Sequence, residues 1–469
     1  MADKPYKVIE GDMLRILPTL AENSFDACVT DPPYELGFMG KKWDSTGVAF
    51  KKETWEQVYR VLKNGAYLLA FGGSRCFHRM ACAIEDAGFE IRDCIMWLYG
   101  SGFPKSMNIG LAVDKRNGVE STVVGNQSVQ DLQEIGKVTG HKMTFHQEGT
   151  ENSPRKDIPI MRANNEWDGW GTCLKPSYEP IIVARKPLDG GVVDNVLKWG
   201  VGGINIDECR VGDEGAVKKV DIVPNSSSKN CGFGCNGKIE QLDMGRFPAN
   251  TILTYDETDF EEVCGGMPNT TSNYNESGKH ETEVHRANAD FLSYGYKERV
   301  DSGFNDSGNA CRYFYCAKAS KKDRDEGLEL FNIVEKSAAE RTNRKEGSAG
   351  INAYAGATGN ARNFHPTVKP VELMQYLIRL VTPKGGNILE PFAGSGTTGK
   401  AAMFENRERN ANYTITMCEL THDYIPIIEA RCDYALNKYK YEILEVVKEH
   451  KENGQMSLFD DLLGGEAND

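Results

Sequence analysis

The sequence predicts an α/β protein in which a parallel sheet carries helices on both faces. Strand-like and helix-like segments alternate at short spacing from residue 7 to residue 98, which is the pattern of such a sheet. The same alternation returns after residue 368, whereas the stretch between is irregular and rich in Gly and Asn. Because 469 residues exceed one average domain, we expect one domain that is interrupted by a large insertion.

Four strands and three helices are predicted in the first hundred residues. Short apolar runs predict the strands, and apolar residues at helical spacing, such as Trp55, Val58 and Leu62, predict the helices. Asn64-Gly65 is a pair that ends helices, and Ser74 is in place to cap the next helix. The strands are expected at residues 7–9, 25–30, 66–71 and 91–98, and the helices at 13–21, 53–63 and 74–87.

Three more strands are predicted further along the chain, which makes seven outside the insertion. They are expected at residues 180–185, 387–389 and 413–418, with helices at 368–381, after 396 and from 422. The chain is thereby divided into four parts. The α/β domain has halves at 1–189 and 346–445, the insertion takes 190–345, and an acidic tail takes 446–469.

The composition is that of an ordinary globular protein, with 40% hydrophobic and 26% charged residues. A net charge of −13 argues against an indiscriminate polyanion binder, although a local basic groove can still bind nucleic acid. No run of 18 apolar residues exists, and the N-terminus lacks the apolar core of a signal peptide. We therefore expect a cytoplasmic protein with no membrane contact, in which the 13 cysteines are mostly reduced.

The strand at 25–30 ends in an unusual way, in the tetrad Asp31-Pro32-Pro33-Tyr34. Proline cannot continue a strand ladder, and each proline pushes the residue before it towards extended geometry. The result is a stiff tip that carries one carboxylate, backbone carbonyls and an aromatic face. These groups suit a planar ligand with an amino substituent, but a Pro-Pro turn with a surface acid has the same sequence.

A glycine turn, Phe392-Ala393-Gly394-Ser395-Gly396, lies directly between a predicted strand and a helix. The helix N-terminus and the close backbone approach at such a turn make a nucleotide-type site. Glu419 ends the next strand, 25 residues after Gly394, where a carboxylate can bind ribose hydroxyls. The turn therefore predicts a cofactor with a ribose.

The same turn has a second interpretation, because Gly394 to Lys400 matches the phosphate-binding pattern G-x-x-x-x-G-K. The next residue is Ala401, so the hydroxyl that would hold Mg²⁺ is missing. An acid-proline pair just before the first glycine is also not expected of that loop. We therefore favour the ribose-binding turn over an ATP or GTP site.

Together, these motifs resemble those of the DNA methyltransferases that modify amino groups of bases, in the permuted arrangement called the β class. Asp31–Tyr34 precedes the insertion and Phe392–Gly396 follows it, which is the order of motifs in that class. The stretch 365–370, His-Pro-Thr-Val-Lys-Pro, is similar to the motif that precedes the cofactor strand in the family. Residues 169–180 and 246–250 resemble members of phage and prophage origin.

The resemblance implies a seven-stranded Rossmann-like sheet that binds S-adenosylmethionine, with the insertion at 190–345 recognising the target. It implies that Asp31, Pro32, Pro33 and Tyr34 are catalytic. Phe392–Thr397 would hold the methionine and ribose, Glu419 the ribose hydroxyls, and Asp12 the adenine amino group of the cofactor. Glu390 stands where the family more often has Asp. The implied cofactor site consists of Asp12, Asp31, His365, Thr367, Lys369, Glu390, Pro391, Phe392, Ala393, Gly394, Ser395, Gly396, Thr397 and Glu419, without a metal.

The tetrad also indicates the chemistry. An exocyclic amine of a base is a poor nucleophile because its lone pair is delocalised into the ring, and acceptors at Asp31 and at the Pro32 carbonyl would localise that pair. The amine is out of reach inside a duplex, so the base should be flipped out of double-stranded DNA and stacked on Tyr34. In the family, Asp at the first position favours adenine N6. N4 methylation of cytosine and a DNA-binding regulator that has lost catalysis stay open as alternatives.

Two further features lie outside this site. Cys209, Cys231, Cys235 and Cys264 could form a zinc site, but their spacing is irregular and plain thiols are the simpler interpretation. Near the C-terminus, Gln455, Leu458 and Phe459 resemble the short peptide by which bacterial proteins bind the replication sliding clamp. A tail with two apolar residues by chance is the alternative.

Overall fold

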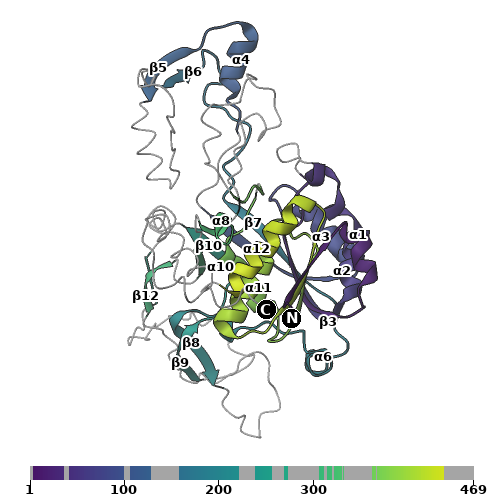
Figure 1. Ribbon diagram of the computed structural model, residues 1–469. Coiled ribbons are helices and arrows are strands. Elements are labelled where there is room, and N and C mark those ends of the chain that lie inside the picture. The colour runs from purple at the N-terminus through teal and green to yellow at the C-terminus, as the bar shows by residue number, and fades with distance from the viewer. Residues whose placement is uncertain are drawn as a thin grey trace, which may run out of the picture. The chain divides into compact units, whose positions relative to one another are not determined.

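The structure is a computed structural model, and its main feature is a nine-stranded sheet (Figure 1). It describes residues 4–35, 42–99, 106–127, 158–220, 238–255, 269–272, 306–310, 314–318, 322–329, 331, 362–365 and 367–437. The chain forms two compact units, the first of which comprises Met1–Asn205, Asn250–Asp259 and Cys316–Asp469. The second comprises Ile206–Ala249 and Phe260–Tyr315.

The order of the strands across the large sheet differs from their order along the chain. From one edge to the other it is β1 (Tyr6–Glu10), β15 (Thr414–Glu419), β14 (Asn387–Glu390), β2 (Phe25–Thr30), β3 (Leu62–Phe71), β7 (Tyr178–Arg185), β4 (Glu90–Tyr99), β10 (Thr251–Tyr255) and β13 (Tyr315–Lys318). The strands β1, β15, β14, β2 and β3 are parallel to one another. Strands from both ends of the chain therefore meet at the β14–β2 pair, where Ile388 lies opposite Ala27.

All seven predicted strands form, which confirms the Rossmann-like α/β class. The sheet gains two strands, β10 and β13, whose residues fall within the numbers of the predicted insertion. The expectation of a parallel sheet is wrong at β7, which runs antiparallel to both neighbours and pairs Ile181 with Phe71 and Tyr178 with Leu98. The apolar run Pro180–Ala184 signals burial on both faces, but burial carries no information on strand direction.

Strand β2 shows why the centre of the sheet is so apolar. All six of its residues are buried, because helices cover both faces of the sheet at this strand. Its one charged residue, Asp26, is satisfied by the Lys63 ammonium at 2.5 Å and by the backbone N–H of Asn387 at 2.7 Å. The buried carboxylate thus ties β2 to both of its neighbours, β3 and β14.

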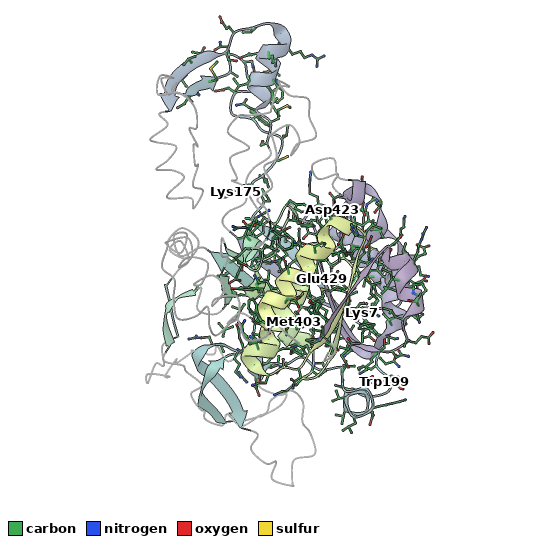
Figure 2. All side chains as sticks on the ribbon, in the orientation of Figure 1. Lys7, Lys175, Trp199, Met403, Asp423 and Glu429 are labelled. Carbon is green, nitrogen blue, oxygen red and sulfur yellow. The ribbon has the colours of Figure 1, made fainter. Side chains whose placement is uncertain are left out.

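Helices lie on both faces of the sheet (Figure 1). One group contains α1 (Met13–Ile16), α2 (Lys52–Val61) and α3 (Phe77–Asp86), and the other contains α10 (Val371–Val381), α11 (Thr397–Arg409) and α12 (Ile425–Leu436). Side chains fill the space between the sheet and these helices, and Met403 of α11 is among the fully buried ones (Figure 2). A buried ion pair between Arg379 of α10 and Glu405 of α11, at 2.5 Å, joins two helices of the second group.

Several predicted helix ends are wrong. The helix expected at 13–21 divides into α1 and a 3₁₀ helix at Leu17–Thr19, because Pro18 cannot donate a helical hydrogen bond. Helix α2 ends at Val61, and Asn64-Gly65 lies inside β3, where the Gly65 N–H donates to the carbonyl of Lys186. Ser74 does not cap α3, which begins at Phe77 with Cys76 at its N-cap.

Smaller elements surround the sheet. In the first unit they are α4 (Ile109–Asn117), the antiparallel pair β5 (Thr122–Gln127) and β6 (Ile158–Arg162), α6 (Val192–Trp199), α8 (Lys322–Asp325) and 3₁₀ helices at Lys42–Ser45, Val48–Phe50 and His422–Tyr424. The second unit holds a 3₁₀ helix at Asp207–Cys209 and the antiparallel pairs β8 (Val211–Val220) with β9 (Lys238–Arg246) and β11 (Asn269–Ser272) with β12 (Asp306–Asn309). This unit falls within the predicted insertion, whereas α6 and β10 belong to the first unit.

The first strand and the last described helix contact each other. The Tyr6 hydroxyl of β1 donates to Asp433 Oδ1 of α12 at 2.6 Å, and the Lys4 ammonium lies 2.9 Å from Asp433 Oδ2. The Ile415 N–H also donates to the carbonyl of Pro5. Strand β1 and helix α12 are therefore neighbouring elements of the first unit.

Some predicted features lie outside the described residues. They include Cys231, Cys235, Cys264 and the three tail residues Gln455, Leu458 and Phe459. Cys209 is described and is buried. Within the described ranges, no group of three or more His, Cys, Asp and Glu side chains is arranged to hold a metal ion. No helix in those ranges has the length and hydropathy needed to cross a bilayer.

Trp55 gives a test of the core formed by α1–α3 and the sheet. It is fully buried, and its indole N–H donates to the Ala49 carbonyl at 2.9 Å. We expect Trp55→Ala to lower the free energy of unfolding by about 3–5 kcal/mol, because it leaves a large cavity. Urea denaturation measures this change. Trp170→Ala, at a position 59% exposed, should change the free energy by less than about 0.5 kcal/mol.

Candidate active site

At the carboxyl edge of the sheet, the loops that follow β1, β2, β3, β14 and β15 surround a cavity of about 1260 Å³. Ligands bind at this edge of α/β sheets in general. The lining includes the predicted site residues Asp12, Asp31, Pro32, Pro33, Tyr34, His365, Thr367, Lys369, Glu390, Pro391, Phe392, Ala393, Gly394, Ser395, Thr397 and Glu419. Two motifs more than 350 residues apart in sequence therefore face one space, and the individual roles of these residues stay predictions.

Gly396 is the predicted site residue that does not line the cavity. It is the N-cap of α11 with φ of +74°, and a Cβ on it would lie 2.8 Å from the Ile428 side chain. Its hydrogen side chain thus lets α11 and α12 approach each other. This contact explains the glycine by packing.

Asp31 follows β2 and presents its two carboxylate oxygens differently. Oδ2 accepts from the Lys369 ammonium at 2.6 Å, whereas Oδ1 is buried and has no hydrogen-bond partner among the described residues. Leaving a buried acceptor unpaired costs about 1–3 kcal/mol, so such atoms are rare in folded proteins. Oδ1 is therefore a candidate acceptor for a ligand N–H.

Tyr34, the aromatic residue of the tetrad, is fixed through its hydroxyl. The hydroxyl donates to Glu179 Oε2 at 2.6 Å and accepts from Lys369 Nζ at 3.2 Å. Burial, followed by the charges of Asp31 and Glu179, holds the pKa of Tyr34 well above its usual value. The ring is therefore neutral, and its position at the cavity wall is determined by polar contacts at its outer end.

Lys369 contacts Asp31, Tyr34 and Glu179 through its ammonium group. Its ammonium lies 2.6 Å from Asp31 Oδ2 and 3.4 Å from Glu179 Oε2, and it faces the rings of Tyr34 and Phe71 at 5.2 and 4.9 Å. Burial alone would lower the pKa of Lys369, but the carboxylates of Asp31 and Glu179 outweigh it and the pKa is raised. The sequence predicted Lys369 as a cofactor residue, and the structure also places its ammonium beside the Asp31 carboxylate.

Glu390 fixes the shape of the glycine turn. Its carboxylate accepts from the Thr398 hydroxyl at 2.6 Å and from the Phe392 N–H at 3.0 Å, and it also accepts from the Thr30 hydroxyl. Burial raises the pKa of Glu390 to about 8, against the effect of these donors. The side chain thereby joins the end of β14 to the end of β2 and to the first turn of α11.

Glu419 and His365 enclose Gly394. The Gly394 N–H donates to Glu419 Oε2 at 2.7 Å, and burial raises the pKa of this carboxyl group. On the other side, a Cβ on Gly394 would lie 3.1 Å from His365 Nε2, and the residue has φ of +55°. Burial lowers the pKa of His365 to about 4, so the ring is neutral, with Nδ1 donating to the Thr367 carbonyl.

Asp12 lies opposite this turn at the end of β1. It is the N-cap of α1, where Oδ1 accepts from the Leu14 N–H at 2.9 Å. Two acidic side chains at neighbouring strand ends, Asp12 and Glu419, therefore line the same cavity as the glycine turn. Acceptors of this kind fit the hydroxyl and amino groups of a nucleoside, so the residues present fit an adenosine-containing cofactor.

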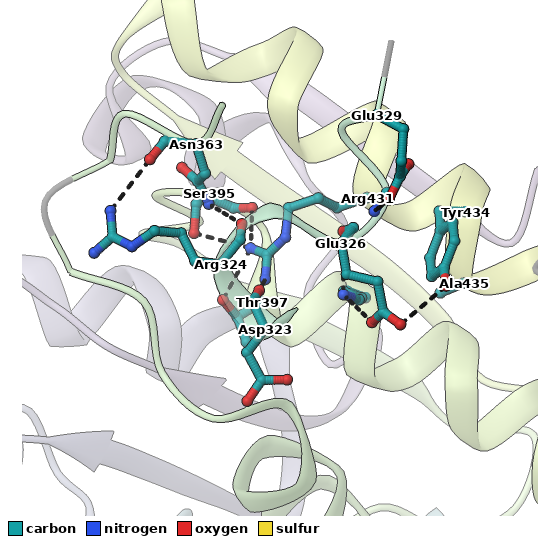
Figure 3. A network of polar contacts seen from close by, with 12 residues as sticks. Asp323, Arg324, Glu326, Glu329, Asn363, Ser395, Thr397, Arg431, Tyr434 and Ala435 are labelled. Carbon is teal, nitrogen blue, oxygen red and sulfur yellow. Dashed lines mark hydrogen bonds and ion pairs between the residues drawn. The ribbon is translucent and has the colours of Figure 1, made fainter. Parts of the chain in front are cut away.

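A buried arginine that the sequence did not single out holds the back of the glycine turn (Figure 3). Arg431 of α12 is fully buried, and its Nη1 donates to the Ser395 carbonyl at 2.6 Å, to Ser395 Oγ at 2.9 Å and to Thr397 Oγ1 at 3.1 Å. Nη2 donates to the Asp323 carbonyl at 2.8 Å. Burial lowers the pKa of Arg431 to about 10, which still leaves it charged at neutral pH.

Lys400, the lysine of the phosphate-loop pattern, does not line the cavity. It is fully buried, and its ammonium lies 2.8 Å from Glu326 Oε2, whose other oxygen accepts from the Tyr434 hydroxyl at 2.9 Å (Figure 3). Burial lowers the pKa of Lys400 to about 8. A lysine that is already paired with a carboxylate outside the cavity argues against the nucleotide-phosphate interpretation.

Arg431 allows a test of this support. We expect Arg431→Lys to weaken binding of S-adenosylmethionine about tenfold or more, because each charged hydrogen bond to the turn is worth about 1.5–3 kcal/mol. Calorimetric titration gives the dissociation constant. Arg407→Lys is the control, since Arg407 donates to the Ala435 carbonyl and does not line the cavity. Unchanged affinity in Arg431→Lys would contradict the supporting role.

Comparison with known proteins shows which family this chain resembles in sequence. The family of N6/N4 methyltransferases, described as DNA methylase, matches residues 25–430. The putative methylase YubD of Escherichia coli is 34% identical over 90 residues, which are 18% of this chain and 39% of YubD. The type II methyltransferase M.HindIII of Haemophilus influenzae is 24% identical over 157 residues, which are 33% of this chain and 37% of that protein.

These matches span less than two fifths of the length of each of the two curated relatives. Among solved structures, the cytosine-N4-specific PvuII DNA methyltransferase superposes with a TM-score of 0.38 at 12% identity, over 93% of this chain and 94% of that chain. S-adenosylmethionine is the cofactor of the matched family. Since the family pattern covers most of the sequence, the chain belongs to the N6/N4 DNA methylase family.

Proposed function

We propose that this protein is a site-specific DNA methyltransferase that methylates the exocyclic N6 of a flipped-out adenine. The observation that carries the proposal is the buried Oδ1 of Asp31, which has no partner in the described part of the chain, on a residue that lines the same cavity as the glycine turn. An amino group supplies the donor that this oxygen lacks. In the same proposal the chain is a β-class, permuted enzyme of phage or prophage type.

The tetrad prepares the amine for reaction. Asp31 Oδ1 and the Pro32 carbonyl accept its two hydrogens and draw them out of the plane of the base, which localises the nitrogen lone pair. Pro33 stiffens the tip, and Tyr34 stacks on the extruded base. S-adenosylmethionine, when bound, would supply a methyl group from its positively charged sulfur, which would leave as the neutral thioether of S-adenosylhomocysteine, while the methylated nitrogen would lose one proton to solvent. The residues of this chain contribute by orienting the amine and excluding water.

The other side of the cavity holds the cofactor in this proposal. Phe392–Thr397 wrap the methionine and ribose, Glu419 accepts from the ribose hydroxyls, and Asp12 accepts from the adenine amino group. His365, Thr367 and Lys369 line the same space, in which the neutral ring of His365 adds no charge beside a cationic cofactor. Glu390 and Pro391 hold the turn in place.

The proposed substrate is double-stranded DNA in the cytoplasm of a bacterial cell. The insertion at 190–345 would recognise the target sequence, and the enzyme would act alone or beside a restriction enzyme. Asp at the first tetrad position is the feature that favours adenine. Methylation of cytosine N4 by the same site is the second candidate, because a cytosine amine presents the same two hydrogens to Asp31 and Pro32.

The reaction product tests the proposal. Incubation with S-adenosylmethionine and DNA, followed by nucleoside digestion and mass spectrometry, should show N6-methyladenine. N4-methylcytosine alone would overturn the adenine assignment, and no methylated base would favour the regulator that has lost catalysis.

Asp31→Ala should lower kcat by about 10²–10³, as loss of one transition-state hydrogen-bond partner does in other enzymes. Asp31→Asn, which keeps one acceptor oxygen, should be less impaired than Asp31→Ala.

We further propose that the acidic tail binds the sliding clamp through Gln455, Leu458 and Phe459. Short motifs of this kind insert their apolar side chains into a preformed pocket. Deleting residues 453–469 should abolish clamp binding, measured by surface plasmon resonance, and leave methyl transfer intact. Binding that survives the deletion would contradict this proposal.

A further inference from the structure

Glu179 comes to the active site because of the direction of β7. The strand runs antiparallel to β3 and β4, so its first residues lie at the edge where the neighbouring parallel strands end. Glu179 is the second residue of β7 and pairs with Trp97 of β4. The segment before it, residues 172–178, lines the cavity as well.

The carboxylate of Glu179 contacts three groups of the site. Oε2 accepts from the Tyr34 hydroxyl at 2.6 Å, Oε1 accepts from the Tyr99 hydroxyl at 3.3 Å, and Oε2 lies 3.4 Å from Lys369 Nζ. Lys369 in turn holds Asp31 Oδ2 at 2.6 Å. Two members of the catalytic tetrad, Asp31 and Tyr34, are thus held by the same carboxylate–ammonium pair.

We propose that Glu179 and Lys369 are positioning residues, which hold Asp31 and Tyr34 in the orientation that methyl transfer needs. The inference rests on the proposed function of the tetrad. Lys369 occupies Oδ2 of Asp31, so that Oδ1 is the oxygen left for the substrate amine. Glu179 prevents the Lys369 ammonium from turning away and fixes the outer end of the Tyr34 ring.

The charges support a functional role over a purely structural one. Two carboxylates and one ammonium leave one net negative charge beside the amine, which becomes positively charged as it accepts a methyl group. This charge interacts more strongly with the amine than it would in bulk water, because the three side chains are largely buried. Folding alone does not require such a pair, since apolar groups that replace both partners at similar volume often cost no stability.

The test compares Glu179→Gln, Lys369→Met and the double variant with wild type. Glu179→Gln is nearly isosteric and can still accept from Tyr34, but it loses the charge that holds Lys369. We expect kcat to fall by about 10–10² in each single variant, as small displacements of reacting groups do. The double variant should be no worse than the more impaired single variant, because the two residues act as a unit.

Three further measurements separate positioning from folding. The dissociation constant for S-adenosylmethionine and the midpoint of thermal unfolding should stay close to wild type in Glu179→Gln. Glu90→Gln is the matched control, since Glu90 pairs with Arg185 at 2.7 Å at the other end of β7, and its kcat should be unchanged. Lys369→Arg should restore part of the kcat lost in Lys369→Met, because it again places a cation on Asp31.

A wild-type kcat in Glu179→Gln would overturn the inference. So would a loss of kcat that is matched by an equal loss of cofactor affinity or of thermal stability. A crystal structure of Glu179→Gln gives a readout that needs no activity. In it, we expect the Lys369 ammonium to leave Tyr34 and the contact with Asp31 to lengthen, and unchanged positions would contradict the inference. If the wild-type enzyme methylates no base, the proposed function fails, and these structural comparisons still decide the positioning.

Discussion

The ion pair between Lys369 and Asp31 is the interaction around which the site is arranged. Its two residues are 338 positions apart in the sequence, and the 2.6 Å contact joins the segment just before α10 to the residue that follows β2. In the sheet, β2, which precedes the tetrad, pairs directly with β14, which precedes the glycine turn. The sheet order thus brings the tetrad and the glycine turn to one edge of the sheet, where both line the same cavity.

Buried charge is used repeatedly at this edge of the sheet, and each charge has a stated partner. Arg431 reaches the glycine turn and the Asp323 carbonyl, while Lys400 reaches Glu326. Both cations are fully buried, so the segment around α8 supplies acceptors that α11 and α12 require. Residues that follow the second compact unit in sequence therefore complete the wall behind the proposed cofactor site.

The sequence was sufficient for the seven central strands, because each is a short apolar run with turn residues on either side. It also located the tetrad, the glycine turn and the acids Asp12 and Glu419, since these follow strands and strand ends converge in α/β sheets. It could not give the direction of β7, so Glu179 was not recognised as part of the site. Arg431 could have been found, since its spacing from Ile427 and Ile428 places it on the buried face of α12.

The contact between Tyr6 and Asp433 bears on the order in which the motifs occur along the chain. Because β1 and α12 are in contact, the first and the last described elements of the sheet domain lie side by side. If the chain were joined at this contact and cut at a different loop, the motifs would occur in a different order around the same cavity. The order of the tetrad and the glycine turn along the chain is therefore not what brings them to one cavity; the pairing of their strands in the sheet is.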